Sequence, residues 1–541
     1  MTRSSLREQF AAIVGDANAI SDPVSLRAAE TATFDVRHEI PLIVRPASRP
    51  EVQECVRLAN RLRTPLYPVS RGRNWGYGSR VPSASGCILL ELSRMNRIVD
   101  FSAEHAYITV EPGVTQGQVV EFLAERRARL ILDCTGASPD CSVIGNTVER
   151  GFGHTPYGDH FAHICNLEVV LPDGDCIETG FGRFGNVAAT PVYRWGVGPI
   201  LDGLFSQSNL GIVTRMTAFL MPEPEYFQAF FFSCEREQDL GPVIDALRPL
   251  RLDGTLRSAS HIGNHYKVVS GIEQYPWDKT GGQTPLTGQV MEALCREFDI
   301  GAWSGSGALY GTRAQVAEAR RLLRRALRRK VSRLRFLDDR ALAFAERFAT
   351  PAKWLAGWDM RRIIELVRPV IGLMRGRPTE YALRSVYWRK RTPIPADMDP
   401  DRDGCGLLWC APVAPIAGSH ATRIAQLASE TLLASGFEPM LSITLITERA
   451  LTCVISISYD RDVPGEDERA MTCHYKLLSA LRDNGYHFYR LGIQSMRCGE
   501  HDDTYAELFQ RLKLVFDPNA ILAPGRYDPR GNRLPVSVIT K

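Results

Sequence analysis

Three glycines lie close together in one stretch that also carries charged and aromatic side chains. Residues 70–79 read SRGRNWGYGS, and Gly72, Gly76 and Gly78 can adopt positive φ and let backbone N–H groups approach a ligand closely. Successive N–H groups in such a loop form a concavity suited to phosphate oxygens. The spacing fits neither GxxxxGK followed by Ser or Thr nor a GxGxxG that opens a helix, because the strand-like run CILLEL follows. Taken alone, the loop is as compatible with a structural turn as with a phosphate site.

Two later segments have a similar character. Residues 141–161, CSVIGNTVERGFGHTPYGDHF, are again rich in glycine, and their polar side chains are Asn146, Thr147, Glu149, Arg150, Thr155 and Asp159. Residues 202–214, DGLFSQSNLGIVT, place small and hydroxyl side chains just before a strand-like run. Three such segments favour a long ligand with a pyrophosphate, held by backbone amides instead of lysines.

The elements that would position these segments alternate between short strands and a few helices. Apolar runs predict strands over 41–46, 65–70, 87–93, 106–113 and 209–224. Helical periodicity marks 48–63 and 115–130, the second of which opens with Thr115 as an expected N-cap. The run NLEVVLPDGDCIETG, 166–180, predicts a hairpin around Pro-Asp-Gly.

After about residue 225 the character of the chain changes. We expect strands over 227–234, 441–447 and 451–460, helices over 240–251 and 467–482, and a surface loop over 392–406, while 270–288 is a polar stretch rich in glycine and threonine. The strongest charge feature is the segment 315–335, QVAEARRLLRRALRRKVSRLR. We interpret it as a solvated helix with Val316, Leu322, Leu323 and Leu327 inward, the alternative being a docking patch for an acidic partner or a membrane surface.

Composition excludes several classes of protein. The 541 residues carry a formal charge of only +4, so bulk electrostatics give no case for nucleic acid. No stretch approaches the ~20 apolar residues of a membrane span, and the N-terminus lacks a signal-peptide core. The 13 cysteines show no CxxC spacing, so no metal site is expected. An odd number of cysteines without a secretory signal predicts buried thiols and a cytoplasmic protein.

Six stretches, spread over residues of about 40 to 527, are similar to those of a known family. They are GRNWGYG, GNTVERGFGHTPYGDH, LDGLFSQSNLGIVT, ALRPLRL, GALYGT and DPNAILAPGR, and they resemble the vanillyl-alcohol oxidase and 4-cresol dehydrogenase (p-cresol methylhydroxylase) family of FAD-linked oxidoreductases. The resemblance implies an α+β fold with FAD as cofactor. It implies an FAD-binding domain over 1–225, a cap of antiparallel sheet and helices over 226–499, and a C-terminal segment, 500–541, that returns to the FAD-binding domain.

The resemblance also implies the reacting groups. Tyr77, Tyr489 and Arg490 match family residues around the substrate phenol oxygen, where two phenol donors and a guanidinium would stabilise a phenolate. A phenolate pushes electron density to its para carbon, which assists hydride transfer from the benzylic position to flavin N5 and leaves a quinone methide. The alternative on the same fold is FAD-dependent oxidation of a non-phenolic alcohol, with the same three residues binding another polar group.

The residues expected to bind FAD come mainly from the three glycine-rich segments. They are Ser70, Arg71, Gly72, Arg73, Asn74, Gly76, Ser142, Gly145, Asn146, Glu149, Arg150, Gly153, His154, Tyr157, Gly158, Gly211, Ile212, Val213 and Arg526, together with Tyr387. The family's histidyl-flavin position is Leu407 here, and no histidine lies between 266 and 419. Histidyl linkage at this site is therefore excluded, which leaves a tyrosyl bond to Tyr387 or non-covalent FAD.

Three other positions differ from the family pattern. Asp140 lies three residues from the place of a family aspartate at flavin N5, so its role as a base is open. A His-His pair of the family is replaced by Thr452 and Cys453, which is expected to alter the pocket beside the flavin. His154 stands where relatives carry tyrosine.

The expected partners are a small-molecule substrate, an electron acceptor and a second copy of the chain. A phenolic substrate is favoured, the electron acceptor is oxygen or a redox protein, and a homodimer is possible. A third hypothesis is a catalytically silent flavoprotein that binds a partner through the basic segment 315–335. The joint presence of Tyr77, Tyr489 and Arg490 argues against it, since a scaffold has no need of three convergent phenol-binding groups.

Overall fold

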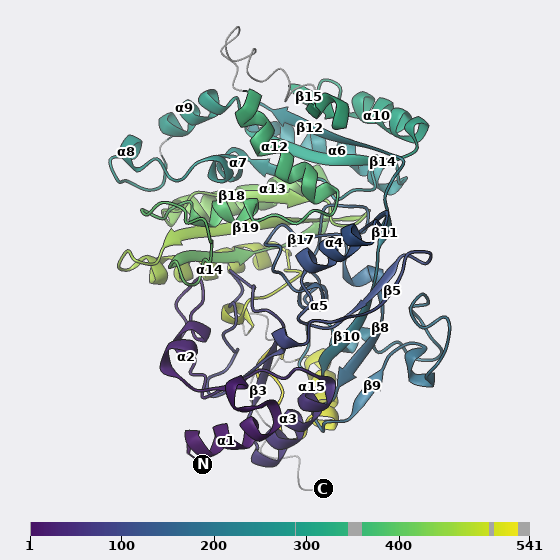
Figure 1. Ribbon diagram of the computed structural model, residues 1–541. Coiled ribbons are helices and arrows are strands. Elements are labelled where there is room, and N and C mark those ends of the chain that lie inside the picture. Colours follow the sequence, from purple (N-terminus) through teal and green to yellow (C-terminus); the bar gives the residue numbers. More distant parts are fainter. Residues whose placement is uncertain (1, 287, 344–359, 497–502, 529–541) are drawn as a thin grey trace.

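The computed structural model describes residues 2–286, 288–343, 360–496 and 503–528, and Figure 1 shows them as two stacked halves. The lower half holds the purple and blue segments with the yellow helix α15, and the upper half holds the teal and green ones. The helices are α1 (Arg3–Val14), α2 (Pro23–Ala29), α3 (Arg49–Leu62), α4 (Gln116–Glu125), α5 (Val143–Val148), α6 (Leu240–Leu252), α7 (His265–Ile272), α8 (Trp277–Thr280), α9 (Gly288–Phe298), α10 (Arg313–Leu327), α12 (Met360–Met374), α13 (Gly418–Ala434), α14 (Glu466–Asp483) and α15 (Thr504–Phe516). The fold is α+β, as expected.

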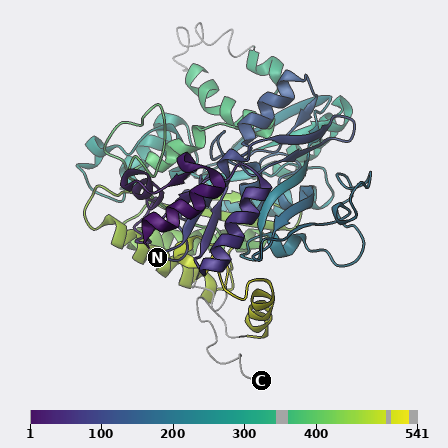
Figure 2. The same ribbon diagram turned by 60° about the horizontal axis from the view of Figure 1, so that its bottom comes forward.

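A small sheet near the N-terminus carries the first glycine loop. Its order is β1 (Ala19–Ile20), β2 (Ile43–Val44), β4 (Ile88–Glu91) and β3 (Leu66–Val69), with β4 parallel to both β2 and β3. Helix α3 crosses between the parallel strands. Ser48 caps it by accepting from the Glu51 N–H, and its apolar stripe, which includes Val52 and Val56, is fully buried. Figure 2 brings the purple N-terminal helices to the front, beside the blue strands.

A second sheet of five antiparallel strands completes the lower half. Its order is β5 (Ile98–Ser102), β6 (Tyr107–Val110), β10 (Ile212–Phe219), β8 (Ile164–Val170) and β9 (Cys176–Glu178), and a further pair joins β11 (Met221–Pro222) to β7 (Leu130–Ile131). The expected hairpin is confirmed as the antiparallel pair β8 and β9. The expected cap is confirmed too, since Thr115 accepts from the Gln118 N–H at 3.1 Å at the start of α4.

One antiparallel sheet of eight strands spans the upper half. Its order is β15 (Arg333–Leu337), β12 (Tyr226–Cys234), β14 (Trp303–Gly311), β13 (His261–Asn264), β18 (Met440–Thr444), β19 (Ala450–Asp460) and β16 (Cys405–Cys410), with β17 (Val413–Pro415) also paired to β19. Helices α6, α13 and α14 cover one face of this sheet (Figure 1). On the opposite face, α12 packs against β12 and β14, α7 packs against β13 and β18, and the remainder faces the lower half.

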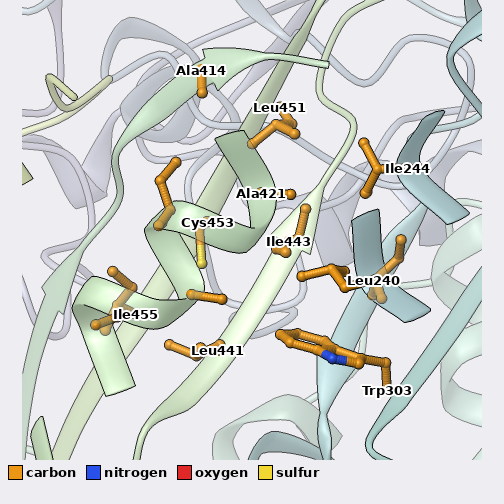
Figure 3. Close-up of a cluster of buried hydrophobic side chains, with 14 of the residues drawn as sticks. Leu240, Ile244, Trp303, Ala414, Ala421, Leu441, Ile443, Leu451, Cys453 and Ile455 are labelled. Atoms are coloured by element: carbon orange, nitrogen blue, oxygen red, sulfur yellow. The ribbon is translucent and has the colours of Figure 1, made fainter. Parts of the chain in front are cut away.

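The largest hydrophobic core lies between those helices and the sheet (Figure 3). Leu240 and Ile244 of α6 meet Ile443 of β18 and Cys453 of β19, and all four side chains are almost fully buried. Because strand side chains alternate between faces, Cys453 points into this core, whereas Val454 and Ser456 face the other way. The expectation that Cys453 alters the pocket beside the flavin is therefore corrected by the structure.

The basic segment 315–335 is not one helix. Helix α10 ends at Leu327, and Arg333–Leu337 forms the edge strand β15 beside β12. Val316, Leu323 and Leu327 are buried as expected, and Leu322 is half-buried. Arg320 and Arg324 lie over the ring of Phe336, at 4.7 and 5.1 Å from its centroid. In the described part of the chain no helix, this one included, is long and apolar enough to cross a bilayer.

The C-terminal segment returns to the lower half through backbone pairing. The Leu66 N–H donates to Ile521 O at 2.7 Å, and the Ala523 N–H donates to Leu66 O at 2.8 Å, so residues 521–523 lie beside β3. Lys513 of α15 holds the turn by donating to Asn209 O, Leu522 O and Asp517. The domain boundaries near 225 and 499 stay predictions, although β12, the first strand of the large sheet, begins at Tyr226.

Candidate functional site

A cavity of 570 Å³ lies between the two halves. Its walls come from the first glycine loop, from 141–154 and from 205–213 below, and from β13, β14, β18 and β19 of the large sheet above. This volume is typical of sites for small molecules and cofactors, which span about 300–1,000 Å³. The structure thus brings all three glycine-rich segments to one place.

Glycine is needed in these segments because the backbones approach other groups closely. Gly72, Gly76 and Gly78 have φ of 71°, 76° and 118°. A Cβ on Gly76 would also lie 3.0 Å from Trp409 Cδ1, and one on Gly145 would lie 3.1 Å from Ser70 Oγ. The first and second segments therefore pack against each other with no room for larger side chains, which leaves their backbone N–H groups along the cavity wall.

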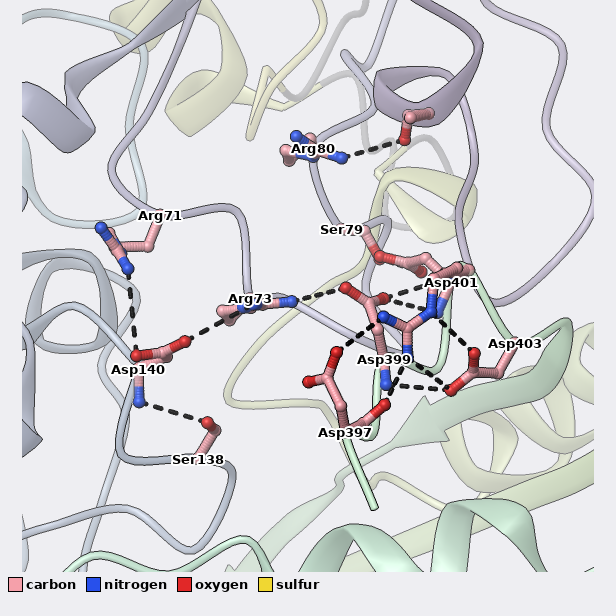
Figure 4. Close-up of polar contacts among 12 residues, drawn as sticks. Arg71, Arg73, Ser79, Arg80, Ser138, Asp140, Asp397, Asp399, Asp401 and Asp403 are labelled. Atoms are coloured by element: carbon pink, nitrogen blue, oxygen red, sulfur yellow. Dashed lines mark hydrogen bonds and ion pairs between the residues drawn. The ribbon is translucent and has the colours of Figure 1, made fainter. Parts of the chain in front are cut away.

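Charged pairs hold the first glycine loop in place (Figure 4). Arg73 donates to Asp399 at 2.7 Å and also pairs with Asp140 at 3.5 Å. Asp140 is half exposed, pairs more distantly with Arg71, and is not part of the cavity wall. In the structure Asp140 therefore fixes the loop and does not face the site as a base.

Tyr77, Tyr489 and Arg490 meet at the cavity wall. The Arg490 guanidinium lies 4.5 Å from the centre of the Tyr77 ring, and the buried Tyr77 hydroxyl has no hydrogen-bond partner among the described residues. Burial, reinforced by the neighbouring Tyr489, holds the pKa of Tyr77 well above its ordinary value, and burial also raises the pKa of Tyr489. Both phenols are therefore protonated donors at neutral pH.

The buried carboxylate of Glu149 binds the Arg490 guanidinium. Arg490 Nε donates to Glu149 Oε2 at 3.2 Å, and its Nη2 donates to Asn74 Oδ1 at 2.6 Å. Glu149 also pairs with Arg526 and accepts from the Tyr527 hydroxyl at 2.9 Å. Two guanidiniums against one carboxylate leave one net positive charge beside the two phenols, which is the electrostatic condition for binding an anionic oxygen.

Two stacked histidines are linked to Tyr489 through Phe152. The rings of His154 and His261 lie 4.2 Å apart, and Phe152 contacts both His261 and Tyr489. His261 Nδ1 lies 2.9 Å from Thr444 Oγ1, while its Nε2 has no partner among the described residues. Burial lowers the pKa of both histidines, so they are neutral, polar members of the wall.

Most residues expected at the cofactor line this cavity. They are Ser70, Arg71, Gly72, Arg73, Asn74, Ser142, Gly145, Asn146, Glu149, His154, Gly211, Ile212, Val213 and Arg526. Gly76, Gly153 and Gly158 shape the backbone behind the wall, where Gly153 donates its N–H to Gly158 O. Arg150 and Tyr157 do not line the cavity. Arg150 is exposed and donates to Ser206, and the Tyr157 ring stacks on His163 with 4.2 Å between the ring centres.

Tyr387 also lies outside the cavity. Its side chain is 1% exposed, and its hydroxyl donates to Asp403 Oδ2 at 2.6 Å. Tyr387 therefore does not border the cavity in this structure, and its contact with the cofactor stays a prediction. The tyrosine of this segment that does line the cavity is Tyr381.

Several wall residues carry no signal in the sequence alone. His261 on β13, Lys267 on α7 and Trp409 on β16 all line the cavity, and so do Ser304 and Ser306 of β14. Strand alternation could have placed Ser304 and Ser306 on one face together. Only the meeting of the two halves shows that this face borders the site.

The chain resembles known proteins over almost its full length. Residues 40–180 match the family model of the FAD binding domain. The chain is 45% identical to 1'-carboxy-chondrochloren decarboxylase of Chondromyces crocatus, over 96% of each chain. It is 31% identical to the 4-cresol dehydrogenase (hydroxylating) flavoprotein subunit of Pseudomonas putida, over 96% of this chain and 94% of that one.

Two solved structures also match the chain over almost its full length. p-Cresol methylhydroxylase with substrate bound matches with a TM-score of 0.86 and 30% identity, covering 97% of this chain and 96% of that chain. The isoeugenol complex of 4-ethylphenol oxidase from Gulosibacter chungangensis matches with a TM-score of 0.88 and 27% identity, covering 98% of both chains.

Proposed function

Because this chain belongs to the vanillyl-alcohol oxidase and 4-cresol dehydrogenase family of FAD-linked oxidoreductases, we propose that it oxidises the benzylic carbon of a para-substituted phenol. It is an FAD-dependent dehydrogenase or oxidase acting on CH–OH or CH groups. The observation that carries the proposal is the meeting of Tyr77, Tyr489 and Arg490 at the cavity wall, with the Tyr77 hydroxyl buried and unpartnered in the described structure.

These three residues would bind the phenol oxygen. The two protonated hydroxyls donate to it, and the net positive charge around Glu149 favours its ionised form. A phenolate makes its para side chain electron-rich, so removal of a hydride from the benzylic carbon leaves a neutral quinone methide. Water can then attack that carbon.

The lower wall of the cavity fits FAD. Gly145 packs closely against Ser70, Gly72 has positive φ, and Arg526 borders the same space, so this wall can take a pyrophosphate close to its backbone. Residues 70–74, 142–149 and 211–213 would hold the cofactor, with the substrate towards Tyr77 and the large sheet. When bound, FAD supplies the acceptor for the hydride.

A second candidate is oxidative decarboxylation, which the 45% identical relative favours, since that protein is named a decarboxylase. If the carbon beyond the benzylic carbon carries a carboxylate, its C–C electron pair can flow into the quinone methide. CO2 then leaves, the ring returns to a phenolate, and the side chain gains a double bond. Both candidates share the first hydride removal and the same phenolate anchor.

A titration under argon tests the phenol assignment. We expect 4-ethylphenol to bleach the flavin absorbance of the holoenzyme, and 3-(4-hydroxyphenyl)propanoate to bleach it with release of CO2 if the second candidate is right. Bleaching by 4-methoxybenzyl alcohol alone would favour the non-phenolic alternative, and a spectrum that no substrate changes would favour a silent flavoprotein. Oxygen uptake during turnover would show whether oxygen or a redox protein is the acceptor.

The position of Tyr387 predicts how FAD is held. Because the Tyr387 hydroxyl is engaged by Asp403 outside the cavity, we expect no covalent bond at this residue and release of FAD on acid denaturation. Mass spectrometry of tryptic peptides checks this. A flavin mass on the peptide that contains Tyr387 would contradict the structure, and one on Tyr381 would place the bond at the tyrosine that borders the site.

A further inference from the structure

Lys267 is a cation at the cavity wall, and no anion pairs with it in the part of the chain that the structure describes. It lies in the first turn of α7, and its Nζ donates to Ser385 Oγ at 2.8 Å. Among the described residues no carboxylate forms an ion pair with it, and Ser385 in turn donates to Ala382 O. The group that accepts from its ammonium in the described structure is therefore a neutral hydroxyl.

Lys267 is half-buried, and two buried lysines show how this protein pairs such a charge elsewhere. Lys390 is bound by Asp460 at 2.7 Å and by Asp462 at 2.6 Å, and Lys513 is bound by Asp517 at 2.7 Å. An ammonium group withdrawn from water without such a partner is costly, and burial lowers the pKa of Lys267 to about 8. Within the described residues, Lys267 has no carboxylate of the kind that pairs with Lys390 and Lys513.

The wall around Lys267 suits a polar group of a ligand. Helix α7 packs against β13, β14 and β18, whose cavity-facing residues include Gly263, Ser304 and Ser442. These small side chains leave space in front of the lysine and add hydroxyl donors without adding negative charge. The phenol-binding residues Tyr77 and Arg490 come from other segments of the wall.

We propose that Lys267 binds a carboxylate group on the side chain of the substrate, so that the cavity takes a phenol bearing an acid rather than a simple alkylphenol. The proposal rests on the phenol function proposed above, because the phenol oxygen is assigned to Tyr77, Tyr489 and Arg490. It names the substrate class and fits either fate of the side chain, hydroxylation or loss of CO2.

Binding of two matched ligands tests the assignment. The probes are 3-(4-hydroxyphenyl)propanoate and its neutral methyl ester, titrated into photoreduced holoenzyme under argon, which cannot oxidise them. We expect Lys267→Gln to weaken binding of the acid by about tenfold or more, the usual loss for a bond to a charged group, and to leave the ester nearly unchanged. Lys267→Arg should restore part of the preference for the acid over the ester. Lys279 is an exposed lysine on α8, and Lys279→Met should leave the affinity for both ligands unchanged.

The outcomes separate this proposal from the function it rests on. Equal losses for acid and ester in Lys267→Gln, an unchanged preference, or loss of FAD from the variant would each overturn the role of Lys267 while leaving the phenol site intact. Wild-type protein that binds neither ligand would overturn the phenol assignment itself, and the carboxylate assignment with it.

The pH dependence gives an independent readout. Since the pKa of Lys267 is lowered to about 8, the charge is fully present below that pH and is lost above it. The ratio of acid to ester affinity should therefore be constant below pH 8 and fall by about tenfold per pH unit above it, until the pKa of the ligand-bound lysine is reached. A flat ratio between pH 6 and pH 10 would overturn the proposal.

Discussion

Replacement of Arg490 with alanine should slow reduction of the bound flavin by a 4-alkylphenol by about 10²-fold or more, while FAD stays bound. A free phenol has a pKa near 10, so holding it ionised at pH 7 needs about 4 kcal/mol of stabilisation. Tyr77 and Tyr489 supply neutral donors, and a charge-assisted bond is roughly twice as strong as a neutral one. The Arg490 guanidinium therefore supplies a large share of the free energy that stabilises the phenolate.

The structure sharpens this expectation. Arg490 is paired with Glu149, which Arg526 also neutralises, so the cluster keeps one net positive charge. Removing Arg490 leaves Glu149 and Arg526 as a neutral pair, and the anionic oxygen then faces no net charge. Stopped-flow reduction and the ultraviolet signature of bound phenolate measure the loss.

Arg490→Lys is the matched control. It keeps the charge but lacks the planar guanidinium whose Nε and Nη2 donate to Glu149 and Asn74, so we expect a rate between those of wild type and Arg490→Ala. Reduction of the alanine variant within about threefold of wild type would show that Arg490 is not the phenolate anchor. The non-phenolic alcohol would then become the preferred substrate.

Replacement of Glu149 with glutamine should lower the free energy of unfolding by about 3–5 kcal/mol, the cost of leaving buried charges unpaired. The carboxylate is buried between Arg490 and Arg526 and also accepts from Tyr527. Glutamine keeps the shape but removes the charge, so two guanidiniums remain with no anion between them. Urea unfolding of the apoprotein measures the change without a contribution from FAD.

The charge of Glu149 should also make the free energy of unfolding depend on pH. Burial alone would raise the pKa of Glu149, but Arg526 and then Arg490 outweigh it and hold the pKa below its ordinary value. A lowered folded-state pKa means that this stability is present above about pH 4.5, the unfolded value, and is lost as pH falls through the folded pKa. The glutamine variant should lack that part of the acid dependence.

Glu54→Gln is the control for this second prediction. Glu54 pairs with Arg57 at 2.8 Å on the exposed side of α3, and such surface pairs contribute about 0–1 kcal/mol. If Glu149→Gln cost no more than Glu54→Gln, the buried cluster would not hold the site together as the geometry indicates.

Local features of this protein were determined by the sequence itself. The positive φ of Gly72, the Thr115 cap and the hairpin at 166–180 each depend on neighbours within a few residues, and the structure contains all of them. Full-length similarity in the order of motifs also sufficed to identify the family and FAD. A local error, the single helix over 315–335, arose because the pairing of β15 with β12 overrides the helical preference of its residues.

Only the tertiary structure decided which side chains share the cavity. Lys267 and His261 reach it because the large sheet lies over the glycine loops, and Tyr387 misses it because its hydroxyl turns to Asp403. Glu149 and Arg526 are separated by hundreds of residues, yet they form one charged cluster with Arg490. Sequence periodicity tells which strand residues share a face, but the packing of distant segments determines what that face meets, and with it which charges stay unpaired.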